Sequence, residues 1–583
     1  MRSFCVFSLV LVAACATARP PVKKFELNLP EQHAALDNGM RIVLLPDSSS
    51  DLVAVVLRVA VGSAEDPPGK SGLAHLVEHL LFEIRPGGPG TATLNALFRQ
   101  QALDHNAYTA LDSTQYLSLA PSSELESLLG FEATRLERGC TGLDQATLDR
   151  DREIVKNELR EKMGPSQASA LERVLSEAYP IGHPYRHTPG GREADLDSVT
   201  LADVCSFVER YYAPARAVIS VAGNVDVARA DRALDASLAR VPARAPAPRA
   251  VVPPGLTAAR VVHFDADIAT RTLVALTPLP AEDDELRAAA EMVSHWGIGG
   301  FQLSPGAVGF SRIPKRGFER AEIERLVEDE RTTLGRFFER ETNFAPLRTL
   351  AACRLLLGLE GLLARADAYA GLAANGHGPG LLTNELQRIE SISADQATRA
   401  VRYLLDPARV VAYVLTPAKG STAAAEARPF APAEDPQPDE LPVDAGEARG
   451  PLAVPPTTGE AEIRSFQLDN GLRVVLRRMH GPVPVASARL SFAVGSMHDP
   501  DEYPGMALVA ASAISRPKIF ARVEATGRTV PVSMRVPIDG FSAFGMTVTG
   551  AAAVDRTTFA GRGLAKDQGL LLEGLASMVR KAE

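Results

Sequence analysis

Two histidines and a glutamate share one face of a predicted helix, in the stretch Gly72-Leu-Ala-His-Leu-Val-Glu-His-Leu-Leu-Phe82. At about 100° per residue, His75, Glu78 and His79 fall within one third of the helix circumference. The leucines and the valine among them point the other way, toward a core. Two imidazoles one turn apart can bind one zinc ion, and a neighbouring carboxylate can polarise a metal-bound water. The alternative is a buried helix that carries two hydrogen-bonded histidines by chance.

A second predicted helix, Asp151-Arg-Glu-Ile-Val-Lys-Asn-Glu-Leu-Arg-Glu161, offers a third ligand. Catalytic zinc usually takes three protein side chains and a water. Asp151 and Glu158 lie two turns apart on the apolar side of this helix. That side is formed by Ile154, Val155 and Leu159. A carboxylate on an apolar face needs a partner, because an unpaired buried charge is costly, and the partner is either a metal ion or an arginine.

The order His-x-x-Glu-His, with Glu158 following 79 residues after His79, resembles the pitrilysin family of inverzincin peptidases. That family includes insulysin and the mitochondrial processing peptidases. The resemblance implies that His75, His79 and Glu158 are zinc ligands and that Glu78 is the general base. It also implies that Asp151, seven residues before the ligand, supports the site from a position where the family usually has glutamate.

Short matches to the same family continue on both sides of this motif. They are Leu36-Asp-Asn-Gly39, Val61-Gly-Ser63, Asn106-Ala-Tyr-Thr109, His183-Pro-Tyr185, Tyr211-Tyr212 and Gly223-Asn-Val-Asp226. In the family, the strand with Asn106, Ala107 and Tyr108 is a sheet edge to which the peptide substrate adds as a further strand. An ordinary sheet edge is the alternative. The implied fold is α+β: a tandem repeat of metallopeptidase-like domains, each a mainly antiparallel sheet packed with helices.

With 583 residues, the chain is too long for one core and should form several domains. We predict a catalytic zinc peptidase domain at 26–237 and a second family domain without a metal site at 256–417. A linker rich in Pro, Ala and acidic residues follows at 418–460, and a degenerate, truncated repeat of the catalytic domain at 461–583. A net charge of −9 without a basic block weighs against a nucleic-acid partner.

Local patterns predict the elements that position the site. Strands are expected at 40–46, 52–61, 106–109, 115–119 and 218–223. Helices are expected from the histidine motif to about Arg85, at 124–138 and at 144–162, with Asp144 as the N-cap of the last. In the second domain, a strand near Leu273 and a closing strand at 410–415 are expected.

An internal repeat bears directly on the number of metal sites. Leu468-Asp-Asn-Gly471 repeats Leu36-Asp-Asn-Gly39, Val494-Gly-Ser496 repeats Val61-Gly-Ser63, and Gly505-Met-Ala repeats Gly72-Leu-Ala. Continuing this register places Leu508, Ala511 and Ser512 where the first copy has its two histidines and its glutamate. None of these side chains binds zinc well or acts as a base. We therefore expect one zinc ion per chain, although mixed nitrogen and oxygen ligands also permit manganese or cobalt.

The second copy stops at Glu583, far short of the length of the first copy and the domain that follows it. In the family, a tyrosine and an arginine from the far half help to bind substrate, and no position here receives that role. We expect either that a companion chain of the same family completes an enclosed chamber, or that this chain is a fragment or a shortened variant.

The first 15 residues contain one positive side chain, a short apolar run and small residues before Cys15, which is typical of a secretory signal. Val12-Ala-Ala-Cys15 also resembles a bacterial lipobox, which implies a lipid on Cys15. A plain signal peptide is the alternative. We expect a periplasmic protein of the bacterial cell envelope, attached to the outer membrane by that lipid alone. Cys140, Cys205 and Cys353 show no disulfide or metal spacing and are expected to be buried thiols.

The function that these features predict is that of a zinc metalloendopeptidase. It would hydrolyse peptides or unfolded protein segments through a zinc-bound water activated by Glu78. The alternative is a non-catalytic or partner-dependent subunit of a heterodimeric peptidase of the same family.

Overall fold

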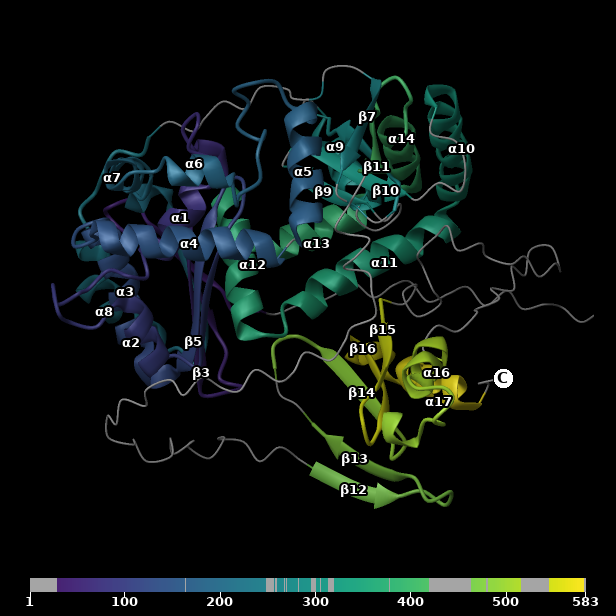
Figure 1. Ribbon diagram of the computed structural model, residues 1–583. Helices are drawn as coiled ribbons and strands as arrows, with labels where there is room; N and C mark the ends of the chain where they lie inside the picture. The colour runs from purple at the N-terminus through teal and green to yellow at the C-terminus, as the bar shows by residue number, and fades with distance from the viewer. Residues whose placement is uncertain are drawn as a thin grey trace, which may run out of the picture.

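The computed structural model describes residues 29–580, with longer gaps at 248–255, 295–299, 313–318, 419–462 and 515–544 and several gaps of one or two residues. The expected signal sequence, Cys15 and nearly all of the expected linker at 418–460 lie outside the described residues. Two sheets with their helices lie side by side, and a smaller unit containing the C-terminus lies below them in Figure 1. None of the described helices is both long and apolar enough to span a bilayer.

The first sheet has six strands in the order β1-β2-β6-β3-β5-β4. Their bounds are β1 (Gln32–Ala35), β2 (Arg41–Pro46), β3 (Leu52–Val59), β4 (Asp104–Thr109), β5 (Thr114–Pro121) and β6 (Ala217–Gly223). Only the β2–β6 pair is parallel, so the prediction of a mainly antiparallel sheet is confirmed. Strand β4 lies at one edge.

Both faces of this sheet are covered, which explains why its central strand reads as an almost unbroken apolar run. Val53, Val55 and Leu57 of β3 face one core, whereas Ala54 and Val56 face another. Helices α1 (Leu73–Leu80), α3 (Leu125–Arg138), α7 (Leu201–Tyr211) and α8 (Val227–Ala236) contribute to the first core. Helix α12 (Leu362–Asn375) packs on the opposite face, against β3 and β6.

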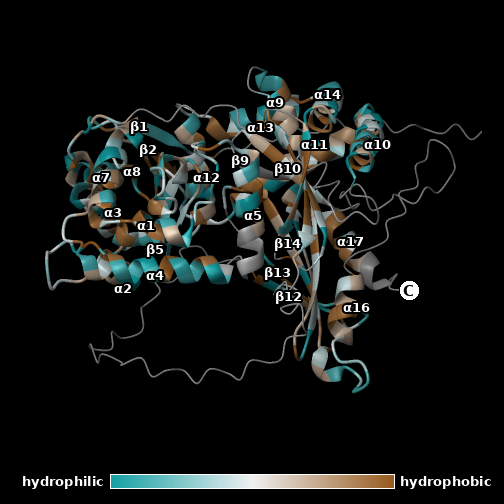
Figure 2. Ribbon diagram, turned by 45° about the horizontal axis from the view of Figure 1, so that its top comes forward, coloured by the Kyte–Doolittle hydropathy of each residue, from teal (hydrophilic) through white to brown (hydrophobic). Residues whose placement is uncertain are grey.

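The second sheet has the strand order β7-β11-β8-β10-β9. Its strands are β7 (Arg260–Ala266), β8 (Thr272–Pro278), β9 (Phe301–Ser304), β10 (Ala307–Arg312) and β11 (Val411–Pro417), so both expected strands are confirmed. Its helices are α9 (Asp284–Met292), α10 (Arg320–Phe338), α11 (Glu341–Gly358), α13 (Leu381–Ser391) and α14 (Ala394–Leu404). Figure 2 shows apolar residues concentrated in the strands, while the outer helix α10 is largely hydrophilic.

Helix α12 belongs to the chain segment of the second sheet, but it makes polar contacts with the segment of the first sheet. Arg365 Nη1 donates to Asp47 Oδ2 at 2.6 Å, and both side chains are buried. Burial raises the pKa of the Asp47 carboxyl, but hydrogen bonds from Ser49 and Arg365 outweigh it, so the pKa lies below its usual value. Arg41 of β2 donates to the carbonyl of Ala373 at the end of α12.

The C-terminal unit repeats the beginning of the first sheet. A hairpin of β12 (Ile463–Gln467) and β13 (Arg473–Arg477) corresponds to β1 and β2. A sheet in the order β14-β16-β15 corresponds to β3-β5-β4. Its strands are β14 (Val485–Phe492), β15 (Thr547–Ala552) and β16 (Thr557–Leu564), with helices α16 (Met506–Ile514) and α17 (Gln568–Arg580). The prediction of a tandem repeat is confirmed.

Three local expectations were wrong. Helix α1 ends at Leu80 and not near Arg85, because a tight turn follows in which Phe82 N donates to His79 O. Ile154 is 42% exposed, because its part of the helix borders a cavity and not a core. Cys140 and Cys205 form a disulfide with a Cα–Cα distance of 5.2 Å. Packing of α7 beside the end of α3 brings these cysteines together, which their spacing does not reveal.

Candidate active site

The loop before α1 fixes where this helix starts. Asp66 accepts hydrogen bonds from Gly72 N at 2.7 Å and Ala74 N at 2.8 Å, which satisfies donors that a helix N-terminus leaves open. Complete burial raises the pKa of the Asp66 carboxyl, and these two bonds oppose that shift. Gly72 has φ +92°, and a Cβ there would lie 2.7 Å from Gly190 O. Glycine therefore lets α1 begin against the loop at 188–190.

The other end of α1 is held by Arg135, which is fully buried in α3. Its Nη1 donates to Leu81 O at 3.0 Å, just past the helix, and its Nε donates to Glu132 at 2.8 Å. Its guanidinium lies 3.9 Å from the ring centre of Tyr116 and 4.5 Å from that of Phe82. A cation at this end complements the helix dipole, so both ends of α1 are anchored.

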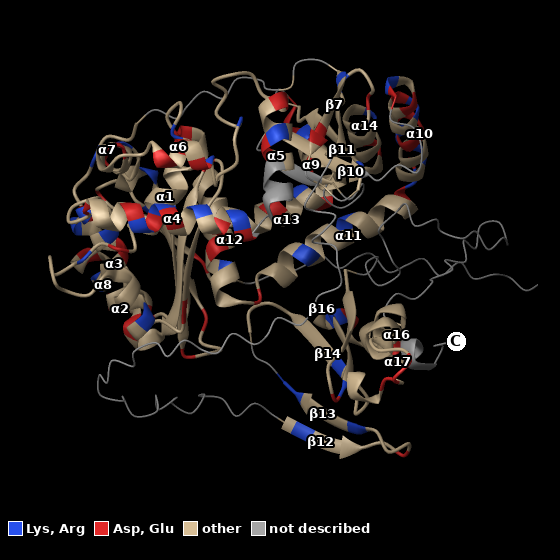
Figure 3. Ribbon diagram, viewed as in Figure 1, with Lys and Arg blue, Asp and Glu red and all other residues tan. Residues whose placement is uncertain are grey.

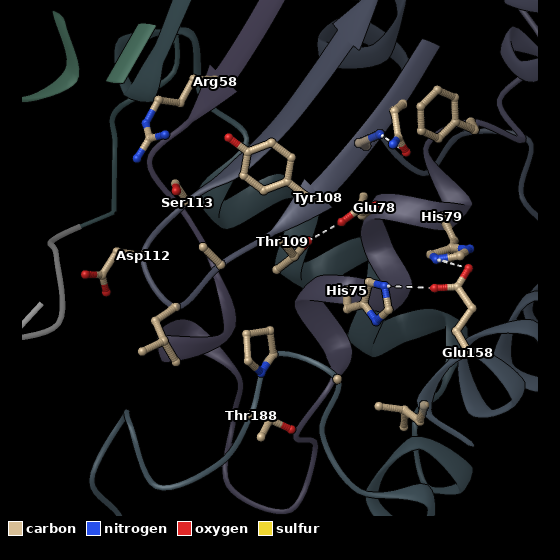
Figure 4. A pocket seen from close by; sticks show the side chains of 18 of the residues that line it. Arg58, His75, Glu78, His79, Tyr108, Thr109, Asp112, Ser113, Glu158 and Thr188 are labelled. Atoms are coloured by element: carbon tan, nitrogen blue, oxygen red, sulfur yellow. Dashed lines mark hydrogen bonds and ion pairs between the residues drawn. The ribbon is translucent and has the colours of Figure 1, made fainter. Parts of the chain in front are cut away.

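Between these anchors, α1 divides into two faces as the sequence predicts. Leu76, Val77 and Leu80 are fully buried in the core. The opposite face borders a cavity of about 1250 Å³, into which His75, Glu78 and His79 project (Figure 4). The two histidine side chains are 16% and 19% exposed, and Glu78 is 5% exposed. The helix presents the histidines to the cavity and keeps the carboxylate largely dry.

Helix α4 (Gln145–Lys162) brings Glu158 to the two histidines. Its Oε2 lies 3.8 Å from His75 Nε2, and its Oε1 lies 3.6 Å from His79 Nε2. Tetrahedral zinc with bonds of about 2.1 Å separates its ligand atoms by about 3.4 Å. Ligand atoms of His75, Glu78 and His79 also lie within 4.8 Å of one another. Two imidazoles and a carboxylate at these separations fit a zinc ion with only small side-chain adjustments.

The predicted supporting residue, Asp151, is buried in α4 and also lines the cavity. Its Oδ1 accepts a hydrogen bond from Arg150 Nε at 2.8 Å, and Arg150 Nη2 reaches Glu83 at 2.9 Å. An arginine partner is thus present for Asp151, and its role toward the ligands stays a prediction. Figure 3 shows acidic and basic residues interspersed along the ribbon of α4, and ion pairs join Arg152 to Asp149 and Lys156 to Glu153. At its start, Asp144 accepts from Thr147 N at 2.8 Å and caps the helix as expected.

Edge strand β4 forms the next wall of the cavity and contains the three predicted substrate-binding residues. Ala107 N donates to Asn106 Oδ1 at 2.9 Å and not to β5, so this donor faces the outer edge. The side chain of Tyr108 lies on the opposite face of the sheet from that of Ala107. Its hydroxyl donates to Asp367 Oδ2 on α12 at 2.7 Å. Burial, together with Asp367, raises the pKa of Tyr108 well above its usual value. In the described part of the chain, no strand pairs with the outer edge of β4.

Family models match two adjacent parts of this region. Residues 41–189 match the model described as insulinase, peptidase family M16, and residues 198–303 match the peptidase M16 inactive domain. This part of the chain is therefore similar to peptidase family M16. The first match contains α1, β4 and α4, and therefore every residue of the candidate site.

Similar proteins include the zinc protease PqqE of Helicobacter pylori, 30% identical over 206 residues, and the probable zinc protease PqqL of Escherichia coli, 26% identical over 265 residues. These matches cover 34% and 43% of this chain and 44% and 28% of the relatives, so the chain spans less than half the length of these proteins. The crystal structure of pitrilysin matches with a TM-score of 0.58 at 16% identity, covering 95% of this chain and 62% of that chain. The fold is therefore that of the pitrilysin-like M16 proteins.

The candidate site also contains residues to which the sequence analysis gave no role. Thr109 Oγ1 lies 2.5 Å from Glu78 Oε2. His105 stacks on Phe98 and bonds to Asn95 Oδ1 at 3.1 Å, and burial lowers the pKa of His105. The two-residue period of a strand places these side chains on the face of β4 opposite to Tyr108. That alternation, applied to the family match at 106–109, could have predicted that Thr109 and Tyr108 face opposite sides of the sheet.

The second copy keeps the backbone of the site without its donors. Gly505 has φ +92°, and Asp499 accepts from Gly505 N at 2.7 Å and from Ala507 N at 2.8 Å, as Asp66 does in the first copy. Helix α16 then carries Leu508, Ala511 and Ser512 in place of the histidines and the glutamate. In the part of the chain that the structure describes, His75, Glu78 and His79 form the one cluster of potential metal-binding side chains.

Proposed function

We propose that this chain is a zinc metalloendopeptidase that cleaves extended peptides or unfolded protein segments. The observation that carries the proposal is that Glu158 lies within 3.8 Å of both His75 and His79. Glu78 lies on the same helix face as the two histidines. The names of the relatives support it, since PqqE is called a zinc protease and PqqL a probable zinc protease.

His75, His79 and Glu158 would hold one zinc ion per chain. When bound, the metal would supply Lewis-acid polarisation of the peptide carbonyl and a lowered pKa for water at the site. The donor set of two imidazoles and one carboxylate leaves room for water and substrate, which is the arrangement of catalytic zinc sites.

Glu78 moves the protons of the reaction. It accepts one from the water whose oxygen attacks the peptide carbonyl carbon, and it later gives that proton to the amine nitrogen as the C–N bond breaks. The products are a free carboxylate and a free amine. Because Glu78 is 5% exposed, its carboxylate meets little bulk water that could compete for the proton.

Strand β4 would bind the peptide backbone by strand addition. The substrate carbonyl would take the hydrogen bond that Ala107 N now gives to Asn106 Oδ1. This exchange would release the Asn106 amide to contact the peptide. A folded protein does not offer an isolated extended strand to a cavity of about 1250 Å³, so substrates are extended or unfolded.

We also propose that the protein is exported and anchored through lipid on Cys15, in the periplasm at the outer membrane. The motivation is the signal-like pattern of residues 1–15, and the Cys140–Cys205 disulfide supports it, because disulfides persist mainly in oxidising compartments. Replacing Cys15 by alanine should move the protein from the membrane fraction to the soluble periplasmic fraction. A wild-type chain that stays in the cytoplasm would contradict this proposal.

A second candidate function is a subunit that needs a companion chain of the same family. It is favoured by a second copy that lacks metal-binding side chains at the positions of His75, Glu78 and His79. A zinc-loaded chain that cleaves only after a companion is added would favour this candidate.

The test of peptidase activity compares wild type with Glu78→Gln on an unstructured, internally quenched fluorescent peptide. We expect Glu78→Gln to lower kcat by about 10²- to 10⁴-fold, the usual contribution of general acid–base catalysis. Zinc content should be equal in both proteins. Ser512→Ala, at the position of His79 in the second copy, is the matched control and should cleave like wild type. A Glu78→Gln protein that cleaves as fast as wild type would contradict the proposal.

A further inference from the structure

A short hydrogen bond links Glu78 to the strand that would bind the substrate. Thr109, the last residue of β4, places its Oγ1 2.5 Å from Glu78 Oε2. This distance is typical of a hydroxyl that donates to an ionised carboxylate. The contact lies at the cavity wall, between α1 and the sheet edge (Figure 4).

The hydrogen bonds around Thr109 indicate that its hydroxyl proton is donated to Glu78. Thr114 Oγ1 lies 3.4 Å from Thr109 Oγ1 and donates its own proton to Val61 O at 2.9 Å. An ionised carboxylate only accepts, and a hydroxyl has a single proton to give. Thr109 therefore donates along the shorter contact, to Glu78.

The second copy separates the structural role of a hydroxyl from this contact. Thr109 pairs with Thr114 across β4 and β5, and Ala552 pairs with Thr557 at the same place in β15 and β16. Thr557 Oγ1 donates to Val494 O at 2.7 Å, just as Thr114 donates to Val61 O. The hydroxyl that ties the strand to the neighbouring loop is thus present in both copies.

The hydroxyl of Thr109 and the carboxylate of Glu78 are present only in the first copy. Their counterparts are Ala552 and Ala511, and the sheet of the second copy forms with alanine at the strand end. The hairpin backbone therefore does not need the Thr109 hydroxyl. Because the fold does not need this hydroxyl and the hydroxyl contacts Glu78, we infer that it acts on the Glu78 carboxylate.

We propose that Thr109 is a positioning residue, whose hydroxyl holds the Glu78 carboxylate in the orientation that proton transfer requires. The proposal rests on the role of Glu78 proposed above. Ala107, two residues earlier on the same strand, would hold the peptide backbone. One rigid strand then sets both the peptide and the base, and its bond from Tyr108 to Asp367 fixes that strand to α12.

The test compares Thr109→Val, which keeps the branched shape without the hydroxyl, with Thr109→Ser, which keeps the hydroxyl. We expect Thr109→Val to lower kcat by about 10- to 100-fold, since a small misplacement of a reacting group can cost that much. Its KM and zinc content should stay within about twofold of wild type. Thr109→Ser should keep kcat within about threefold of wild type.

Ser118→Ala is the matched control, because Ser118 in β5 donates to Val55 O at 3.4 Å and does not line the cavity. Its kcat should equal that of wild type. A loss of kcat in Ser118→Ala equal to that in Thr109→Val would overturn the proposal. So would a Thr109→Val protein with wild-type kcat, or a Thr109→Ser protein as slow as Thr109→Val.

Crystal structures of wild type and Thr109→Val provide a readout that does not depend on turnover. We expect the Glu78 carboxylate of the variant to leave its wild-type position, and an unchanged position would overturn the proposal. A wild-type chain that binds zinc but cleaves no peptide would contradict the proposed function, whereas the two crystal structures would still decide whether Thr109 positions Glu78.

Discussion

The two copies of the strand–helix pattern share a backbone and differ in chemistry. Gly39 and Gly471 have φ of +88° and +86°, and Gly72 and Gly505 both have φ of +92°. Ser63 N donates to Ala110 O in the first copy, as Ser496 N donates to Ala553 O in the second. Within these matching segments, the side chains of one helix face and one strand end differ in chemistry, so this backbone can form without the site.

The copies also differ in how firmly they hold the helix. In the first copy, α1 is anchored by Asp66 and Arg135 and covered by α4. In the second copy, Leu508 is 54% and Val509 is 68% exposed on α16. Among the described residues of the second copy, no counterpart of α4 covers α16 and no carboxylate takes the place of Glu158. A metal site needs both the motif and the element that brings Glu158 to it.

The largest expected effect comes from giving the first helix the residues of the second. The triple replacement His75→Leu, Glu78→Ala and His79→Ser should abolish zinc binding and peptide cleavage. The fold should survive, because the second copy forms the same backbone with these residues. Metal analysis, cleavage assays and circular dichroism measure the three outcomes. Stoichiometric zinc in the triple variant would mean that the metal binds elsewhere, and it would contradict the assignment of the metal site to the first copy.

The reverse exchange, Leu508→His with Ala511→Glu and Ser512→His, sharpens the same point. It should not create a stoichiometric zinc site, because Glu158 comes from α4. Zinc binding by this variant in the absence of the first site would show that the motif alone suffices.

The next effect concerns the third ligand itself. Glu158→Gln should weaken zinc binding by at least about 100-fold, since even partners one shell further out typically contribute 10- to 100-fold. Glutamine has nearly the same length and shape as glutamate, so the thermal midpoint of the metal-free protein should not change. Competition with a fluorescent chelator measures the affinity. An unchanged affinity would remove Glu158 from the ligand set.

A smaller effect distinguishes the two helix starts. Gly72→Ala combines a left-handed φ with a Cβ placed 2.7 Å from Gly190 O, and it should destabilise the protein by about 3 kcal/mol. Gly505→Ala has the same φ, but no atom of the described residues lies within 4 Å of the new Cβ, and it should cost about 1–2 kcal/mol. Thermal midpoints of both variants test this order. Equal losses would mean that the close approach to Gly190 does not matter.

The smallest effect is the pH dependence of the Asp47–Arg365 pair, which only the first copy has, since the repeat register places Met479 at the position of Asp47. The folded-state pKa of Asp47 is lowered, so its stabilising contribution is present above the unfolded pKa of about 3.9 and is lost as the pH falls below it. Between pH 5 and about pH 3, the thermal midpoint of wild type should fall by about 2–4 °C more than that of Asp47→Asn. Parallel curves would contradict this.

Much of this arrangement follows from local sequence patterns. The spacing of His75, Glu78 and His79 on an otherwise apolar helix predicted which side would be buried, and the structure confirms that side. The family resemblance identified Glu158, and the structure brings it beside both histidines, although its role as a ligand stays a prediction. Strands and caps could be predicted because their signals lie within a few residues of one another.

The remainder depends on contacts between distant parts of the chain. The Cys140–Cys205 disulfide spans 65 residues, and α12 crosses from the second segment to cover the first sheet. Ile154 reads as a core residue in sequence but borders a cavity. Thr109 was part of a recognised motif, yet its contact with Glu78 follows only once β4 is placed against α1.

We propose that the first copy alone holds a catalytic metal. The most direct measurement is the zinc content of the purified chain, determined together with cleavage of a quenched peptide with and without chelator. We expect about one zinc per chain, and we expect the chelator to abolish cleavage and added zinc to restore it. A chain that contains no zinc, or that cleaves equally well with its zinc removed, would contradict it.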